Sequence, residues 1–307
     1  MRICFLLLLV ITPLTAPARV YITIIQGLGG NDNYARQFDE QTKITTTAAA
    51  QITDKDRVTV LAGTGATRKN ILAHFEKLQK SVTAGDRTVL FLFGHGSYDG
   101  QQYKFNIPGP DLTGDDLGEI LKASRAKQQL LVNTSSASGA VLKELQSDSR
   151  IIITATRNGN ERNAPRFGNY FVAALSDHSA DTNKNESISA EEAFTYAERL
   201  TQDYYKKEGR LATEHPQLEG KLAGQFNIAR LVSIPEETAN PAVAGLIKQR
   251  QEIDQKIDDL QSHKDEFQSS EDYYTRLQDL LLQLSLLDEQ IDKLKDATAD
   301  DSEDDQP

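Results

Sequence analysis

TVLFLFGHG, residues 88–96, is the stretch that predicts the fold of this chain. Its residues 89–93 are all apolar, which is typical of a strand buried on both faces of a parallel sheet. Gly94 and Gly96 then enclose His95, so a titratable side chain follows the strand directly. In open α/β sheets, sites gather at the carboxyl ends of the strands. The stretch therefore predicts both a central strand and a candidate site residue.

Residues 19–233 repeat this alternation of short apolar runs with helix-like stretches. The runs predicted as strands are Val20–Gln26, Arg57–Ala62, Thr88–Gly94, Gln129–Asn133, Arg150–Thr156 and Phe226–Ser233. The stretches predicted as helices lie near 33–51, 67–83, 114–124, 138–147 and 190–207. Such alternation favours the α/β class, with a mostly parallel six-stranded sheet flanked by helices.

A heptad pattern sets residues 243–295 apart from the α/β region. Pro235 and Pro241 bracket a linker, residues 234–242, and the apolar residues beyond it recur at alternating spacings of four and three. Two heptad helices and a polar turn predict an antiparallel helical hairpin of the coiled-coil type. Extra leucines leave two alternatives open, packing on its own domain or association with a partner, including self-association. Residues 296–307 are predicted to be a disordered acidic tail.

The first 18 residues have the layout of a secretory signal peptide. Arg2 precedes a short apolar run at residues 3–11, and Ala16 and Ala18 fit a small-residue cleavage site. That run is too short to span a membrane, and we expect no membrane span in the later segments. We therefore expect an exported protein, periplasmic or extracellular, after cleavage near Ala18. Cys4 is the only cysteine, so the mature chain is expected to have no thiol for catalysis.

Charge and glycine spacing exclude two kinds of ligand. The formal charge is −11, from 34 basic and 45 acidic residues, which argues against nucleic acid as a partner. The glycine runs at residues 27–30 and 63–65 lack the spacing of a dinucleotide loop and the lysine of a phosphate loop. We therefore expect no nucleotide cofactor, and no cofactor is required for the chemistry considered below.

Polar residues follow two of the predicted strands and form the candidate site. His95 comes after the strand at residues 88–94, and Ser136 comes three residues after the strand at residues 129–133. A histidine and a hydroxyl at adjacent strand ends have the residue types of a base and a nucleophile. The N–H groups of Gly96 and Ser136 are candidates to hold an oxyanion. Asp99 is a candidate to orient the histidine, as is Asp111.

This ordered set resembles the caspase/legumain superfamily of cysteine peptidases, clan CD, in its secreted bacterial branch. The family's His-Gly falls on His95-Gly96, and its Ala-Cys-x-Ser-Gly motif falls on residues 135–139, with Ser136 at the cysteine position. Residues 151–156 resemble the strand beside the specificity pocket, and residues 105–112 and 211–216 look similar to segments of bacterial relatives. The resemblance covers roughly residues 20–233. Arg157, Asn158 and Glu161 follow that strand and are candidates to bind substrate.

Ser136 is where this chain departs from the family, because serine needs a well-placed base whereas cysteine is intrinsically nucleophilic. The resemblance therefore implies a peptidase fold that has lost its nucleophile and binds peptide or protein without cleaving it. Two alternatives stay open. One is a serine-dependent hydrolase that uses Ser136 and His95, and the other is a scaffold that acts through the C-terminal coiled coil.

Residues 181–192 match the twelve-residue spacing of an EF-hand loop. The predicted calcium ligands are Asp181, Asn183, Asn185, Ser187, Ser189 and Glu192. Glu186 occupies the position that is usually glycine, which strains the turn. The alternative is a loop that keeps this shape through Asp and Asn hydrogen bonds without a metal. Calcium is thus the single metal that the sequence suggests.

Overall fold

A six-stranded sheet with the order β10-β8-β7-β3-β1-β2 forms the centre of the α/β region. The computed structural model describes residues 18–231, 241–262, 264, 267 and 269–303. The strands of the sheet are β1 Val20–Gln26, β2 Val58–Leu61, β3 Arg87–Phe93, β7 Gln128–Asn133, β8 Arg150–Thr154 and β10 Gln217–Glu219. All are parallel except β10, which is antiparallel to β8. The predicted fold class is confirmed.

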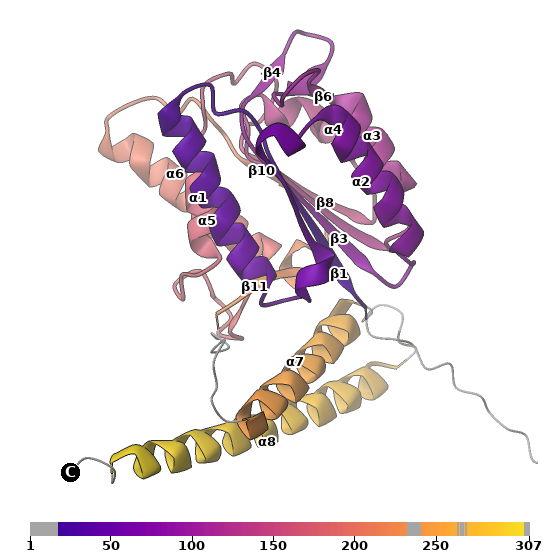
Figure 1. Ribbon diagram of the computed structural model, residues 1–307, viewed down its shortest axis with the longest axis vertical. Coiled ribbons are helices and arrows are strands. Elements are labelled where there is room, and N and C mark those ends of the chain that lie inside the picture. Colours follow the sequence, from indigo (N-terminus) through magenta and orange to yellow (C-terminus); the bar gives the residue numbers. More distant parts are fainter. Residues whose placement is uncertain (1–17, 232–240, 263, 265–266, 268, 304–307) are drawn as a thin grey trace, which may run out of the picture.

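Helices cover both faces of this sheet (Figure 1). One face carries α1 Asp32–Ala49, α5 Phe167–Ala174 and α6 Ala190–Lys207, and the other carries α2 Arg68–Ser81, α3 Gly114–Ala123 and α4 Leu142–Leu145. Successive strand residues point to opposite faces, so Phe91 and Phe93 join the core under the first layer while Leu90 and Leu92 join the second. This two-sided burial explains why the strands read as continuous apolar runs.

The sequence-based prediction was wrong about the sixth strand. The apolar run at residues 226–233 contains β11 Asn227–Arg230, which pairs with β9 Ser187–Ser189 in a separate two-stranded sheet. Ile228 and Ala229 are apolar because they pack into the core on the α1 side. The sixth strand of the main sheet is β10, a three-residue edge strand that is too short to give a periodic signal. Helix α5 was also not predicted.

A small three-stranded sheet lies at the carboxyl ends of the main strands and carries the residues that follow His95. It consists of β4 Gly96–Tyr98, β5 Tyr103–Phe105 and β6 Leu112–Thr113. Short 3₁₀ turns complete the α/β region, η1 Lys55–Arg57, η2 Gly63–Gly65, η3 Ser138–Val141 and η4 Ala223–Gln225. The η3 turn and α4 together occupy residues 138–145 of the stretch predicted as one helix at 138–147.

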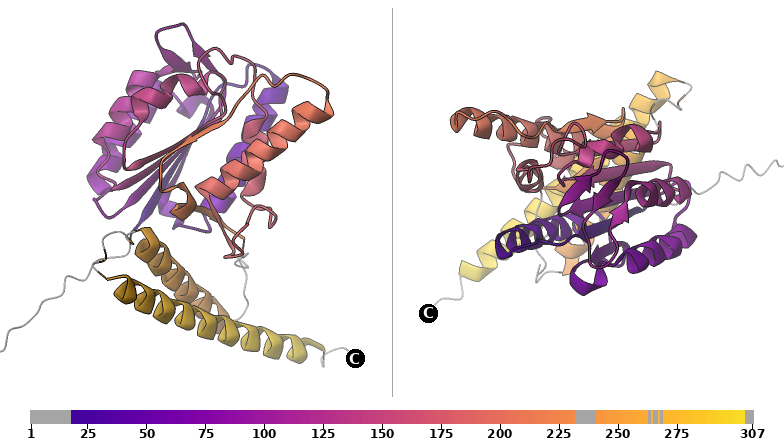
Figure 2. Two further views of the ribbon diagram at one scale, coloured as in Figure 1. Left: turned by 180° about the vertical axis from the view of Figure 1, so that it is seen from behind. Right: turned by 90° about the horizontal axis from the view of Figure 1, so that it is seen from above.

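Two long helices, α7 Pro241–Ser262 and α8 Ser270–Glu303, follow the α/β region. They contact each other through a small apolar cluster in which Val243 and Ile247 of α7 meet Ile291 of α8. Figures 1 and 2 show this pair beyond the amino-terminal edge of the sheet, at the end of the molecule opposite β4 to β6. A self-contained coiled-coil hairpin stays a prediction. The pair leaves the carboxyl ends of the strands uncovered.

Some predicted boundaries differ from the structure or fall outside it. Helix α8 runs on through Glu303, so much of the segment predicted as a disordered tail at 296–307 is helical, as its alanines allow. Nearly all of the predicted signal peptide and most of the linker at 234–242 lie outside the described residues. Among the helices that the structure describes, none is long and apolar enough to cross a bilayer.

Candidate functional site

His95 lies just beyond β3 and is fixed by the chain that follows β1. Its Nε2 is 3.2 Å from the carbonyl oxygen of Gly29, and because a carbonyl can only accept, Nε2 carries the proton. The ring packs edge-on against Tyr34 and Phe38 of α1, with centroid distances of 4.7 and 5.2 Å. In the described chain no carboxylate bonds to this ring, and Asp99 pairs with Lys104 instead.

Ser136 lies beyond β7, the strand next to β3. The register pairs Leu92 with Asn133, and the two site residues follow these positions by three residues each. The prediction that His95 and Ser136 follow neighbouring parallel strands is therefore confirmed. Ser136 is only 3% exposed, and within the described residues no hydrogen bond links its hydroxyl to the His95 ring. His95 and Ser136 therefore follow neighbouring strands, and their side chains are not hydrogen-bonded to each other.

Gly96 holds the two strand ends in close contact. A side chain at this position would come within 2.4 Å of the Ser136 carbonyl oxygen and 2.6 Å of Ser135 Oγ, so only glycine fits. Ala137 donates its N–H to Glu161, whereas the Ser136 N–H has no acceptor among the described residues. The Ser136 amide is thus a free donor beside the strand ends, as an oxyanion site requires.

The turn after Ser136 is strained and is held by the segment that follows β8. Ala137 has a φ of 56°, a left-handed conformation that is uncommon for alanine. Gly139 donates its N–H to Thr156 Oγ1 at 2.9 Å, and a side chain there would come within 2.3 Å of the Arg157 backbone. Strained backbone of this kind clusters at functional sites. The turn is therefore shaped by tertiary contacts rather than by its own propensity.

A buried network of polar side chains contacts the backbone of Ser136 through Ser135, whose hydroxyl donates to the Ser136 carbonyl oxygen. The hydroxyl of Tyr103 lies 2.6 Å from Ser135 Oγ and accepts from Asn133 Nδ2 at 2.9 Å. Burial raises the pKa of Tyr103 to about 12, although its bonds to Ser135 and Asn133 act in the opposite direction. Tyr103 therefore remains a neutral phenol at physiological pH. The network positions the turn and adds no charge to it.

The three residues predicted to bind substrate lie in the segment after β8. Arg157 is exposed, and its backbone N–H donates to Glu161 Oε2 at 2.9 Å. Asn158 Oδ1 accepts from the backbone of Asn160. The carbonyl oxygen of Glu161 accepts the N–H of Ala137 at 2.8 Å. This segment therefore forms one wall of the Ser136 turn, and its side chains are largely engaged in local structure.

Sequence reasoning did not identify His215, which completes this wall. Its Nδ1 is 2.6 Å from Glu161 Oε1, and its backbone N–H donates to Glu161 Oε2 at 3.0 Å. The His215 side chain is 43% exposed, while that of Glu161 is 12% exposed. The neighbouring Glu214 is buried, and this burial raises its pKa even though Arg166 and Phe167 donate to it. The run Glu-His-Pro at 214–216 was the signal that could have drawn attention to this pair.

The loop predicted to bind calcium is closed by its own hydrogen bonds. Asp181 accepts from the backbone of Asn185 and Glu186, and Glu186 has a left-handed φ of 62°. Glu192 accepts from Ser189 and from Thr182. Burial opposes ionisation of Glu192, but these hydrogen bonds outweigh it and lower its pKa.

The other predicted ligands extend the same pattern. Asn183 accepts from Asn185, which itself accepts from Ser187. In the part of the chain that the structure describes, no group of three or more His, Cys, Asp or Glu is arranged to hold a metal. The bonding supports the alternative of a loop that is closed without an ion. Calcium binding stays a prediction.

A parallel sheet with a histidine after β3 and a hydroxyl after the neighbouring β7 defines a caspase/legumain-like α/β protein. The family model of the peptidase C13 family matches residues 23–224, so the chain belongs to this family, the legumain family of clan CD. The chain is also similar to a protein from Geobacter sulfurreducens of known crystal structure, with 14% sequence identity and a TM-score of 0.47. That match covers 71% of this chain and 100% of the other. No curated protein matches the sequence.

Proposed function

We propose that this chain binds peptide or protein segments at the site around His95 and Ser136 and does not cleave them. The observation that carries the proposal is the state of the Ser136 hydroxyl, which has no hydrogen bond to a base among the described residues. A serine hydroxyl needs such a base to attack a carbonyl group. His95 instead donates through Nε2 to Gly29, and no described carboxylate orients its ring.

Features that favour binding are nevertheless present. The free N–H of Ser136 can donate to the carbonyl of an extended peptide, and the exposed Arg157 stands on the neighbouring wall. Helices α7 and α8 lie at the far end of the molecule, so they leave this edge open (Figure 1). The carboxyl ends of the strands therefore remain available to bind a peptide even though serine stands at the position of the family's cysteine.

Cleavage and binding should be measured on the same peptide library. We expect wild-type protein to retain a subset of the peptides without hydrolysing any of them, and Arg157→Glu to change the retained subset. Ser136→Cys is the variant most able to gain hydrolysis, since it restores the family's nucleophile. Wild-type turnover that disappears in Ser136→Ala would contradict the proposal and establish a serine hydrolase.

The hydrolase alternative is favoured by one observation, the His215–Glu161 pair. A carboxylate bonded to one ring nitrogen leaves the other nitrogen available as a base, as in a catalytic triad. Glu161 is tied through its carbonyl to Ala137, directly after Ser136. If wild-type turnover is found, its loss in His215→Ala would identify this pair as the source of the base, and its loss only in His95→Ala would identify the family histidine.

We further propose that the chain acts outside the cytoplasm after removal of its first 18 residues. The basic residue, the short apolar run and the small residues at 16–18 support this. Amino-terminal sequencing of the protein recovered from the periplasm or medium should begin near Arg19. An intact Met1 terminus on mature protein would contradict export.

A further inference from the structure

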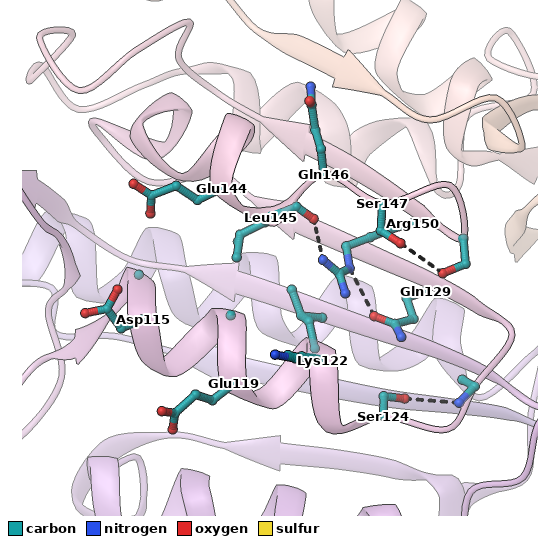
Figure 3. A pocket seen from close by; sticks show the side chains of 15 residues that line it. Asp115, Glu119, Lys122, Ser124, Gln129, Glu144, Leu145, Gln146, Ser147 and Arg150 are labelled. Carbon is teal, nitrogen blue, oxygen red and sulfur yellow. Dashed lines mark hydrogen bonds between the residues drawn. The ribbon is translucent and has the colours of Figure 1, made fainter.

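A polar groove lies between α3 and the α4 segment, above the starts of β7 and β8 (Figure 3). Its volume is about 730 Å³, within the range of about 300–1,000 Å³ that small-ligand sites occupy. Gln129 and Arg150 on its floor belong to the first residues of their strands. The floor of the groove therefore lies at the opposite end of β7 from Ser136.

Arg150 is an unusual feature of this groove. Its Nε–H donates to Gln129 Oε1 at 3.0 Å, and Nη1 donates to the carbonyl oxygen of Leu145. Both acceptors are neutral, and no described carboxylate forms an ion pair with it. Burial without a neighbouring anion lowers the pKa of this guanidinium. A partly buried guanidinium with unused N–H groups is a ready partner for a carboxylate, which it can bind with two parallel hydrogen bonds.

The remaining charges of the groove are divided between its two ends. In Figure 3 Arg150 and Lys122 lie toward one end of the groove, and the carboxylates lie toward the other, with Glu144 on the α4 side and Asp115 and Glu119 on the α3 side. Asp115 and Lys122 both lie on α3, seven residues apart. A helical rise of about 1.5 Å per residue puts them roughly 10 Å apart along the axis. An extended tripeptide has about this length at roughly 3.3–3.6 Å per residue.

We propose that this groove binds a short peptide through its two free termini. The terminal carboxylate occupies the end formed by Arg150 and Lys122, and the terminal ammonium group faces Glu144 and Asp115. Recognition depends on the termini, because the lining is mainly polar and offers few apolar side chains to contact those of the peptide. This inference stands independently of the function proposed for the strand-end site.

Isothermal titration calorimetry of the full chain with trialanine tests the charge pattern. We expect measurable binding of trialanine, with affinity about tenfold lower for trialanine amide, since the amide removes a charged hydrogen bond. N-acetyl-trialanine is also expected to bind more weakly. Absence of trialanine binding would overturn the proposal, as would equal affinity for the amide. Binding of inorganic phosphate with no binding of trialanine would show a simple anion site and would also overturn it.

Variants separate the groove from the strand-end site. Lys122→Glu on the exposed face of α3 should weaken trialanine binding about fivefold or more through charge repulsion. Lys143→Glu, the same change on an exposed residue of α4 outside the groove, is the matched control and should have no effect. Arg150→Gln should abolish binding, and its fold is checked by thermal unfolding. If Arg157→Glu weakens binding while Lys122→Glu does not, the peptide binds at the strand ends and the groove proposal is wrong.

Discussion

At the scale of single residues, Gly139 shows how closely the Ser136 turn is packed. An added methyl group would meet backbone atoms of Thr156 and Arg157 at 2.3 Å, and backbone cannot move aside cheaply. We expect Gly139→Ala to destabilise the protein by about 1–3 kcal/mol, as overpacked cores do. Thermal unfolding of Gly65→Ala is the control, because nothing lies within 4 Å of that position. Equal melting temperatures for the two variants would show that the turn is not held as described.

The environment of Asp116 predicts that the stability of the folded protein depends on pH. Burial opposes its charge, but Arg68 and Thr113 donate to it, so its pKa is lowered. A lowered pKa adds stability that is present above the pKa of the unfolded chain, about 3.9, and is lost as the pH falls through the folded-state pKa. Asp116→Asn should therefore cost about 1–2 kcal/mol at neutral pH.

The cost of Asp116→Asn should shrink as the pH is lowered below about 4. Urea unfolding at several pH values measures this. Asp115→Asn, on an exposed neighbour in the same helical turn, is the control and should cost little at any pH. A pH-independent cost of Asp116→Asn would contradict the assignment of the charged form.

At the scale of elements, the 181–192 loop and α6 form one unit. Ser189 and Glu192 make a capping box at the start of α6, and Glu192 also accepts from Thr182. Because these hydrogen bonds hold the loop through its own residues, we expect a chelator to leave the melting temperature unchanged. Glu192→Ala should lower stability by about 1–2 kcal/mol through loss of the cap. A melting temperature that falls with the chelator would mean that a metal is part of the native structure.

Weak calcium binding is tested on the same element. If the loop binds calcium with a dissociation constant near 1 mM, roughly 10 mM calcium should raise the free energy of unfolding of the protein by about 1.4 kcal/mol. Such a gain should disappear in Asp181→Ala, since this residue is the first ligand of the predicted set. Magnesium at the same concentration is the control for ionic strength. If calcium and magnesium act alike, the loop has no specific calcium site.

At the scale of the whole molecule, α7 and α8 contact the α/β region through charges. Arg230 of β11 pairs with Asp254 of α7, and Arg250 of α7 pairs with Glu186 of the 181–192 loop. Arg250 also pairs with Asp254 on its own helix and with Asp288 of α8, so it links the two helices to each other as well. The apolar cluster between α7 and α8 is separate from the two cores that flank the sheet. A chain that ends before Pro241 should therefore keep a cooperative thermal transition. A truncated chain without one would make these helices part of the main core.

The exposed face of α8 predicts self-association. Leu281, Leu282 and Leu286 are about half exposed, as is Tyr274 on the same helix. Light scattering after gel filtration should show a dimer or larger species, and Leu282→Glu should shift it to the monomer by placing a charge in an apolar interface. Gln283→Glu on the same helix is the control. A wild-type monomer at high concentration would contradict self-association through these helices.

The amino-acid sequence by itself determined the features that depend on local pattern. Buried strands are continuous apolar runs, so the α/β class and the positions of His95 and Ser136 after neighbouring strands could be predicted. Only the tertiary structure decided which distant segments meet. It placed β10 rather than β11 at the sheet edge, brought His215 to Glu161 across 54 residues, and set Arg150 beside Gln129 without an anion. The reason is physical: periodicity reports the burial of each segment, whereas partners across the chain follow from the packing of the whole core.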